Sequence, residues 1–458
     1  MAARRGTESL AGQARPLAVA VFVAASAWSA GGTDLRLLDA VAKSDRAAVA
    51  RLLSAGVDVD ASRPDGATPL AWAVHVQDRE IAGRLLTAGA DPNSGNDYGD
   101  TPLTLAAANG DGEMLEELLA AGADPGARRW NGETALMLAA GTGLADGVRL
   151  LAAKGAFLDA TESQRGQTAL MWAAAEGHGN AVKALVEAGA DPNIASKRGF
   201  AALAFAATRN EPDSVRALLN AGADPDRATI EGSSPAGIAA SYGHSETLGL
   251  LVDAGADIAT PDDEGRTPLY LAARAGDAKS VSLLLAAGAD PDRRTAAVES
   301  FGSNRDLRRP DGEDTPLLAA ALGGHLDIMR LLVRAGADPK ARTQDGATLL
   351  MQASRSVEPE VVEYAYSLDS DITARTKIGR GVMHAAVMLK AADPDQDVIC
   401  AIIRFLAQKG ADPDPIDEGG RTAISTADVW PLEKASMLLY ELTLAAGREP
   451  KILPTDLR

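Results

Sequence analysis

The sequence predicts an all-α solenoid of about twelve helix-turn-helix repeats joined by hairpin-like fingers. Three observations support this fold class: a four-residue motif at a nearly constant interval, a capping residue in the same register, and the composition. Aromatic residues form only 4% of the 458-residue chain, while hydrophobic residues form 46% of it. This composition favours small, closely packed helices over a core built around large rings.

The recurring motif is Ala-Gly-Ala-Asp or a close variant of it. Eight of the ten intervals between its eleven copies are 33 or 34 residues long, and the other two, of 48 and 41 residues, contain insertions. A threonine or serine recurs in the same register and can cap the amino terminus of a helix. The motif copies begin at Ala55, Ala88, Ala121, Lys154, Ala188, Ala221, Ala254, Ala287, Ala335, Leu368 and Lys409. The capping residues are Thr68, Thr101, Thr134, Thr168, Ser234, Thr267, Thr315, Thr348 and Thr422.

The fifth repeat shows how one interval should fold. A first helix is expected to begin after Thr168, whose hydroxyl can cap it, and to end at Gly177. A second helix is expected over Ala181–Ala188, and Gly189 can stop it in a left-handed conformation that costs glycine little. The polar stretch before the next repeat often carries a turn pair, which predicts a hairpin-like finger. The turn pairs are Asp65-Gly66, Asn131-Gly132, Glu231-Gly232, Glu264-Gly265, Asp311-Gly312 and Asp345-Gly346.

The period of 33 residues with these markers resembles the ankyrin-repeat family, from about Asp34 to about Gly447. Together with the leader described below, it makes the chain similar to exported ankyrin-repeat proteins of the bacterial type. The resemblance implies a non-catalytic interaction scaffold that binds a protein partner through its fingers and the concave face of its first helices. Two alternatives stay open: a secreted effector acting on a host protein, and an accessory subunit of an enzyme.

One repeat domain is expected over residues 34–450, followed by a tail over residues 451–458. The longer insertion, residues 293–310, falls in a finger, and the shorter one, about residues 391–396, falls between two helices. The longer insertion has few large apolar residues, so we expect it to be a protruding, mobile finger. A disordered loop without a binding role is the alternative.

Residues 1–27 predict a signal peptide. Three arginines precede an apolar stretch over residues 17–27, and the small residues at the end of this stretch fit a cleavage site. The stretch is shorter than the roughly 20 residues that a helix needs to cross a bilayer, so no membrane span is expected. We expect a mature chain that begins near Trp28 and is periplasmic or secreted. An uncleaved anchor and a disordered tail are the alternatives.

Charge and rare residues exclude several classes of function. The chain has 45 basic and 63 acidic residues, and this net charge of −18 opposes nonspecific binding of nucleic acid. The single cysteine, Cys400, cannot form an intramolecular disulfide or a thiolate zinc cluster. His178, His244 and His325 share one register in alternate repeats, about 16–20 Å apart, which is too far to share a metal. We therefore expect a monomeric protein with no catalytic site, cofactor or metal.

The first group of candidate binding residues is an arginine column, defined by Arg294, Arg342 and Arg375. Each follows a motif aspartate by four residues, so three consecutive repeats present arginine at one position. Because repeats stack at roughly 10 Å, the column should attract an acidic segment of a protein partner. Further basic residues beside the column are Arg293, Lys340, Lys377 and Arg380. Acidic residues that could instead neutralise it as a solvated face are Asp292, Asp306 and Asp345.

The second group lies in an earlier finger. Trp130 follows Arg128 and Arg129 there, at a place where the repeat offers no core. Exposed tryptophan beside arginine is the composition favoured at interface hot spots. The sequence therefore predicts a second contact with the partner at these three residues.

Overall fold

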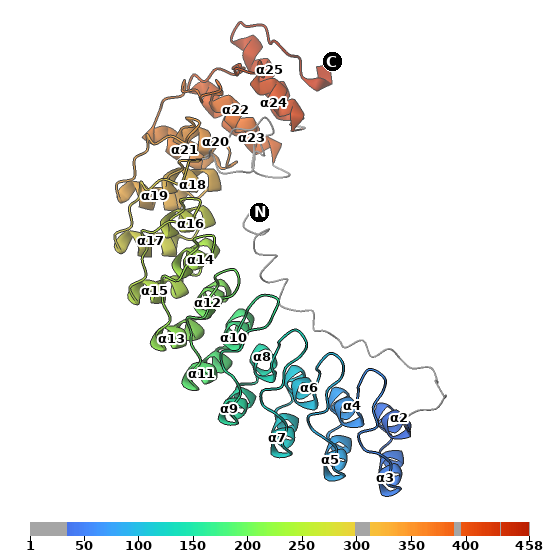
Figure 1. Ribbon diagram of the computed structural model, residues 1–458. Coiled ribbons are helices and arrows are strands. Elements are labelled where there is room, and N and C mark those ends of the chain that lie inside the picture. Colours follow the sequence, from blue (N-terminus) through green and yellow to red (C-terminus); the bar gives the residue numbers. More distant parts are fainter. Residues whose placement is uncertain (1–33, 298–311, 389–394, 431, 458) are drawn as a thin grey trace. The chain divides into compact units, whose positions relative to one another are not determined.

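The computed structural model describes residues 34–297, 312–388, 395–430 and 432–457 (Figure 1). Within these ranges the chain forms 24 α-helices, one short 3₁₀ helix and two isolated β-bridges. The chain divides into two compact halves, residues 1–230 and 231–458. The predicted signal peptide, most of the longer insertion and residues 391–394 of the shorter one lie outside the described residues. None of the described helices is long and apolar enough to span a membrane.

The amino-terminal half contains six helix pairs. Its first helices lie side by side in one layer and its second helices in another (Figure 1). The first helices are α2 (Arg36–Ala42), α4 (Pro69–His75), α6 (Pro102–Asn109), α8 (Ala135–Gly141), α10 (Ala169–Glu176) and α12 (Ala202–Arg209). The second helices are α3 (Arg46–Ser54), α5 (Arg79–Thr87), α7 (Gly112–Ala120), α9 (Ala145–Ala153), α11 (Gly179–Glu187) and α13 (Pro212–Asn220).

The carboxy-terminal half repeats this arrangement with six further pairs, so the expected count of about twelve repeats is confirmed. Its first helices are α14 (Pro235–Tyr242), α16 (Pro268–Ala275), α18 (Pro316–Gly323), α20 (Leu349–Ser354), α22 (Val382–Val387) and α24 (Ala423–Val429). Its second helices are α15 (Ser245–Asp253), α17 (Ala278–Ala286), α19 (Leu326–Arg334), α21 (Pro359–Leu368), α23 (Gln396–Gln408) and α25 (Glu433–Ala445). The 3₁₀ helix η1 (Thr455–Leu457) lies in the tail.

The predicted helix caps are present. All nine predicted threonine and serine residues accept a hydrogen bond from the backbone N–H three residues later. Such a side chain satisfies one of the four N–H groups that a helix start leaves without a partner. A repeat therefore fixes the start of its first helix through one local bond.

The fifth repeat follows its predicted course except at the bounds of its second helix, which ends at Glu187, one residue before the expected end. Helix α11 begins two residues earlier than expected, because the His178 carbonyl already accepts hydrogen bonds from the N–H groups of Ala181 and Val182. Gly189 has a φ of 98°, the left-handed conformation expected at the end of this helix. Leu170 of the first helix and Leu185 of the second are buried, so the narrow apolar faces meet inside the stack.

The longer insertion leaves the base of its finger intact. Thr295 N donates to Asp314 O at 2.9 Å, and Asp314 N donates to Thr295 Oγ1 at the same distance. In the finger that follows, Thr343 and Ala347 are joined by the equivalent backbone bond. The additional residues therefore enter between two positions that an uninterrupted finger would also join.

Candidate functional site

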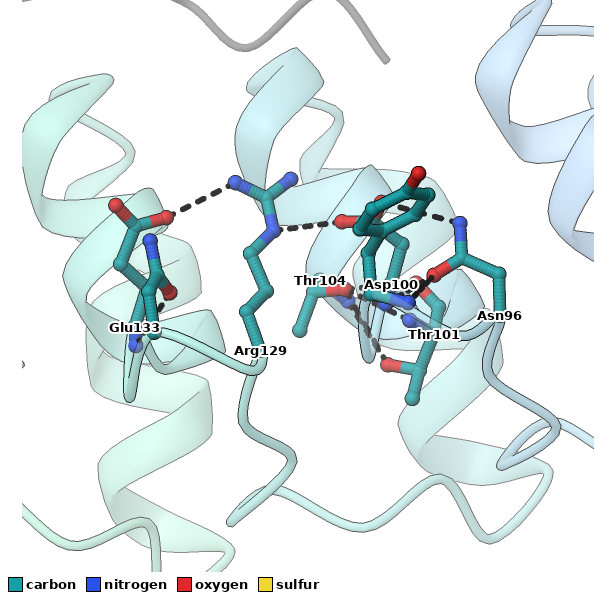
Figure 2. Close-up of polar contacts among 8 residues, drawn as sticks. Asn96, Asp100, Thr101, Thr104, Arg129 and Glu133 are labelled. Carbon is teal, nitrogen blue, oxygen red and sulfur yellow. Dashed lines mark hydrogen bonds and ion pairs between the residues drawn. The ribbon is translucent and has the colours of Figure 1, made fainter. Parts of the chain in front are cut away.

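Two successive fingers of the amino-terminal half are joined by the side chain of Arg129 (Figure 2). Its Nε atom lies 2.7 Å from Asp100 Oδ1, and its Nη1 atom lies 3.1 Å from Glu133 Oε2. Asp100 Oδ2 also accepts a hydrogen bond from Asn96 Nδ2 at 3.2 Å. Because only 13% of the Arg129 side chain is exposed, this charge holds fingers together and does not face solvent.

The residues on either side of Arg129 point the other way. Arg128 and Trp130 are exposed, as expected for alternate residues of an extended segment that begins at the bridge between Arg128 and Thr134. Trp130 is 70% exposed. Of the three predicted residues, Arg128 and Trp130 therefore remain available for binding, whereas Arg129 is engaged within the chain.

Two exposed aromatic residues accompany this pair and were not predicted from the sequence. Tyr98, 61% exposed, lies on the preceding finger, and its carbonyl accepts a hydrogen bond from Trp130 N at 2.9 Å. Phe157 stands where most repeats carry the motif aspartate, and the Arg128 guanidinium lies 5.6 Å from its ring centroid. That replacement of aspartate by phenylalanine was the signal in the sequence for a specialised finger.

The fingers of this half form a backbone ladder. In each finger one turn amide donates to a turn carbonyl of the preceding finger, over 2.8 to 3.1 Å. The tip side chains therefore lie on a continuous support and not on independent loops. The bonds run from Asp97 to Asp65, Trp130 to Tyr98, Ser163 to Asn131, Lys197 to Arg165, and Ile230 to Arg198.

The arginine column of the carboxy-terminal half is bound to its own chain. Arg294 Nη1 donates to Arg342 O at 2.7 Å and to Glu313 O at 3.0 Å. Arg342 Nη2 lies 3.4 Å from Asp371 Oδ2, and Arg375 Nη2 lies 3.7 Å from an oxygen of the Asp412 carboxylate. Each guanidinium thus reaches the following repeat, and the binding role of the column stays a prediction.

The acidic residues that neutralise the column differ from those expected. Asp371 and Asp412 pair with the arginines, whereas Asp292 accepts the backbone N–H of Asp338 and Asp345 accepts the hydroxyl of Thr343. Asp306 lies outside the described residues. The expectation missed these pairs because the arginines reach across the stack and not along their own finger.

Among the basic residues beside the column, Arg380 is turned inward. Its Nε atom lies 3.3 Å from Asp417 Oδ2, and 16% of its side chain is exposed. Burial raises the pKa of Asp417, but hydrogen bonds from Arg421 N and Arg380 outweigh burial and leave this pKa below its ordinary value. Arg293, Lys340 and Lys377 are exposed.

Two histidines connect successive repeats. His178 Nε2 lies 3.1 Å from Gly141 O, and His384 Nε2 lies 3.1 Å from Arg421 O, so both rings bridge successive repeats. Among the described residues, no cluster of three or more histidine, cysteine or acidic side chains is placed to hold a metal ion.

Comparison with known proteins identifies the repeat. A family model described as ankyrin repeats (3 copies) matches residues 37–129, 105–196, 197–295 and 297–376. A search of curated proteins found no match. Among solved structures, the ankyrin repeat domain of Bcl-3, a unique member of the IkappaB protein family, is 30% identical, with a TM-score of 0.42 over 48% of this chain and 100% of its own. The human ASB11 ankyrin repeat domain is 28% identical, with a TM-score of 0.43 over 52% of this chain and 97% of its own.

Proposed function

Because this chain belongs to the ankyrin-repeat family, we propose that it is a non-catalytic scaffold that binds a protein partner through its fingers. Ankyrin repeats generally mediate protein–protein interaction. The arrangement of fingers suits this role, since exposed side chains rest on a hydrogen-bonded ladder and keep their positions before a partner arrives.

One observation carries the proposal: Trp130 is 70% exposed on a finger whose backbone is fixed from both sides. An indole that is mostly exposed contributes little to the packing of the repeat, yet it is a side chain that interfaces favour as an anchor. The ion pair between Arg129 and Asp100 holds the backbone beside it, so little freedom is lost when the ring is covered.

The second contact in this proposal is the arginine column with the exposed Arg293, Lys340 and Lys377 beside it. Arg293, Lys340 and Lys377 would attract an acidic part of the partner most strongly, because Asp371 and Asp412 partly neutralise the arginines of the column. The proposed scaffold is also exported, for which the predicted signal peptide over residues 1–27 is the supporting observation.

Photo-cross-linking tests the binding role. We would replace Trp130 by p-benzoylphenylalanine in the full chain, expose cells that express it to ultraviolet light, and identify the proteins that are attached. The control places the same residue at Thr87, an exposed position at the end of the second helix α5. A defined adduct from position 130 and none from position 87 supports the proposal. Adducts from position 87 alone, or from neither position, contradict it.

A further inference from the structure

Six exposed side chains at the finger tips of the amino-terminal half form what we call the tip row. The backbone ladder ties their fingers in sequence, so the members follow one another along one edge. The row has apolar residues at both ends and cations in its centre. Its members are Tyr98, Trp130, Arg165, Lys197, Arg198 and Ile230.

Of the five acidic residues in the turns of these fingers, three are directed inward. Asp100 and Glu133 flank the Arg129 guanidinium. Glu162 is buried, and its carboxylate accepts hydrogen bonds from the backbone N–H groups of Gln164, Arg165 and Gln167 over 2.6 to 3.0 Å. Asp97 and Glu231 are exposed, but they lie beside Tyr98 and Ile230, at the two ends of the row. The centre of the row is therefore cationic in a protein whose overall charge is strongly negative.

The equivalent turns of the carboxy-terminal half differ in charge. Exposed acidic residues occupy several of them, at Asp263, Glu264 and Glu418, and the exposed cation Lys377 occupies one. The cationic centre is thus not a general property of the fingers in this chain. It belongs to two consecutive fingers, those of Arg165 and of Lys197 with Arg198, which follow the fingers of Tyr98 and Trp130.

The ends of the row are apolar. Tyr98 and Trp130 are exposed on adjacent fingers at one end, and Ile230 is 66% exposed at the other. Large apolar side chains at rigid finger tips favour contact with apolar groups of another molecule. Along the row, aromatic side chains are therefore followed by cationic ones and then by an aliphatic one.

We infer that the tip row binds an extended segment of a protein partner, with acidic side chains in its centre and apolar side chains at its ends. The inference rests on the proposed protein-binding function and specifies the partner's chemistry. Arg165, Lys197 and Arg198 are exposed cations whose combined charge would attract the carboxylates of such a segment. Lys197 Nζ donates to Ser163 O at 2.6 Å, so its ammonium already lies over the neighbouring finger.

The spacing of the fingers sets the length of this segment. Four intervals of roughly 8–10 Å separate the finger of Tyr98 from that of Ile230, which gives a span of roughly 32–40 Å. An extended chain advances about 3.3 Å per residue, so about ten to twelve residues cover the row. A shorter acidic peptide would reach the cations without reaching both apolar ends.

A displayed library of random twelve-residue peptides tests the inference, with the full chain as the target. We expect the selected peptides to be rich in Asp and Glu at central positions and apolar near both ends. The charge-reversal variant R165E/K197E/R198E should bind the best peptide at least about tenfold more weakly, because three favourable charge contacts become repulsive. The variant Y98S/I230S should weaken binding and relax the preference for apolar ends.

The matched control is R149E/K183E/R216E. These three exposed cations lie on the second helices of the same half, and their reversal changes the net charge by the same amount. We expect at most about a twofold change in affinity for this control, and thermal melts of both variants establish that they fold. Equal weakening in both variants, no acidic preference among the peptides, or no selected peptide at all would overturn the inference. If the Trp130 cross-link persists in those cases, the proposed function stands and only the partner's chemistry is wrong.

Discussion

The Arg129 guanidinium lies 2.7 Å from the Asp100 carboxylate of the preceding finger, and both side chains are largely buried. This pair gives the finger two faces with different roles. Arg129 fixes the backbone on the inner side, while Trp130 faces solvent on the outer side. The stability of the finger and the binding of a partner can therefore be changed separately.

Replacing Arg129 by alanine should destabilise the amino-terminal half by about 1–3 kcal/mol. The reason is that the nearly buried Asp100 carboxylate would lose its cation while staying out of water. Arg128→Ala is the control, since Arg128 is exposed and its loss should change the free energy of unfolding by less than about 0.5 kcal/mol. Urea unfolding followed by circular dichroism measures both, and equal stability of the two variants would refute the structural role of Arg129.

A missing cap offers a gain of stability. Ala201 stands at the start of α12, and its backbone angles, φ −90° and ψ 170°, are close to those of the capping residue Thr168. Ala201→Thr should therefore add the side-chain bond that nine other first helices have, and raise stability by about 0.5–1 kcal/mol. Thr168→Ala is the converse change and should cost a similar amount. A lower thermal midpoint for A201T would show that its buried surroundings cannot accept the larger side chain.

Acid should weaken the carboxy-terminal half through His384. Burial lowers the pKa of this ring below its ordinary value of 6.5, and Gly381 N donates to Nδ1 at 3.3 Å. The imidazole is therefore protonated near pH 6.5 in the unfolded chain but only at lower pH in the folded chain. The free energy of unfolding should fall as the pH drops below about 6.5. His384→Gln should reduce this fall in denaturant melts between pH 7.5 and 5.5. If the free energy of unfolding of the variant depends on pH as that of the native protein does, other titrating groups cause the fall.

The mature amino terminus is a separate prediction. Cleavage after the apolar stretch over residues 17–27 should leave a chain that begins near Trp28. Amino-terminal sequencing of the protein isolated from the cell envelope or the culture medium tests this. An intact Met1 on protein recovered from the cytosol would be incompatible with export.

Local bonds were predictable from the sequence, whereas contacts between repeats were not. A cap such as Thr168 bonds within three residues, so its residue type and register are sufficient to predict it. Arg129 and Trp130 differ in role because of Asp100, which lies in another repeat. Their residue types predicted that both would belong to one binding hot spot. Their roles differ because one side chain points into the stack and the other points into solvent.

The same distinction applies to the arginine column. A shared position after the motif aspartate predicted that Arg294, Arg342 and Arg375 lie in consecutive repeats. It could not predict that each side chain would reach the following repeat, where Asp371 and Asp412 receive two of them. Pairing across the stack depends on the spacing of repeats and on rotamers, which no single repeat specifies.

Two triple variants of the carboxy-terminal half can therefore separate binding from structure. R294Q/R342Q/R375Q removes the engaged arginines and should lower the thermal midpoint slightly, because exposed ion pairs contribute little each. R293Q/K340Q/K377Q removes exposed cations beside them and should leave the midpoint unchanged. If this surface attracts an acidic part of the partner, both variants should weaken capture of the cross-linked partner and flatten its dependence on salt. If both variants capture the partner as well as the native protein does, with the same dependence on salt, the column is not part of the binding surface. Its arginines would then have only a structural role.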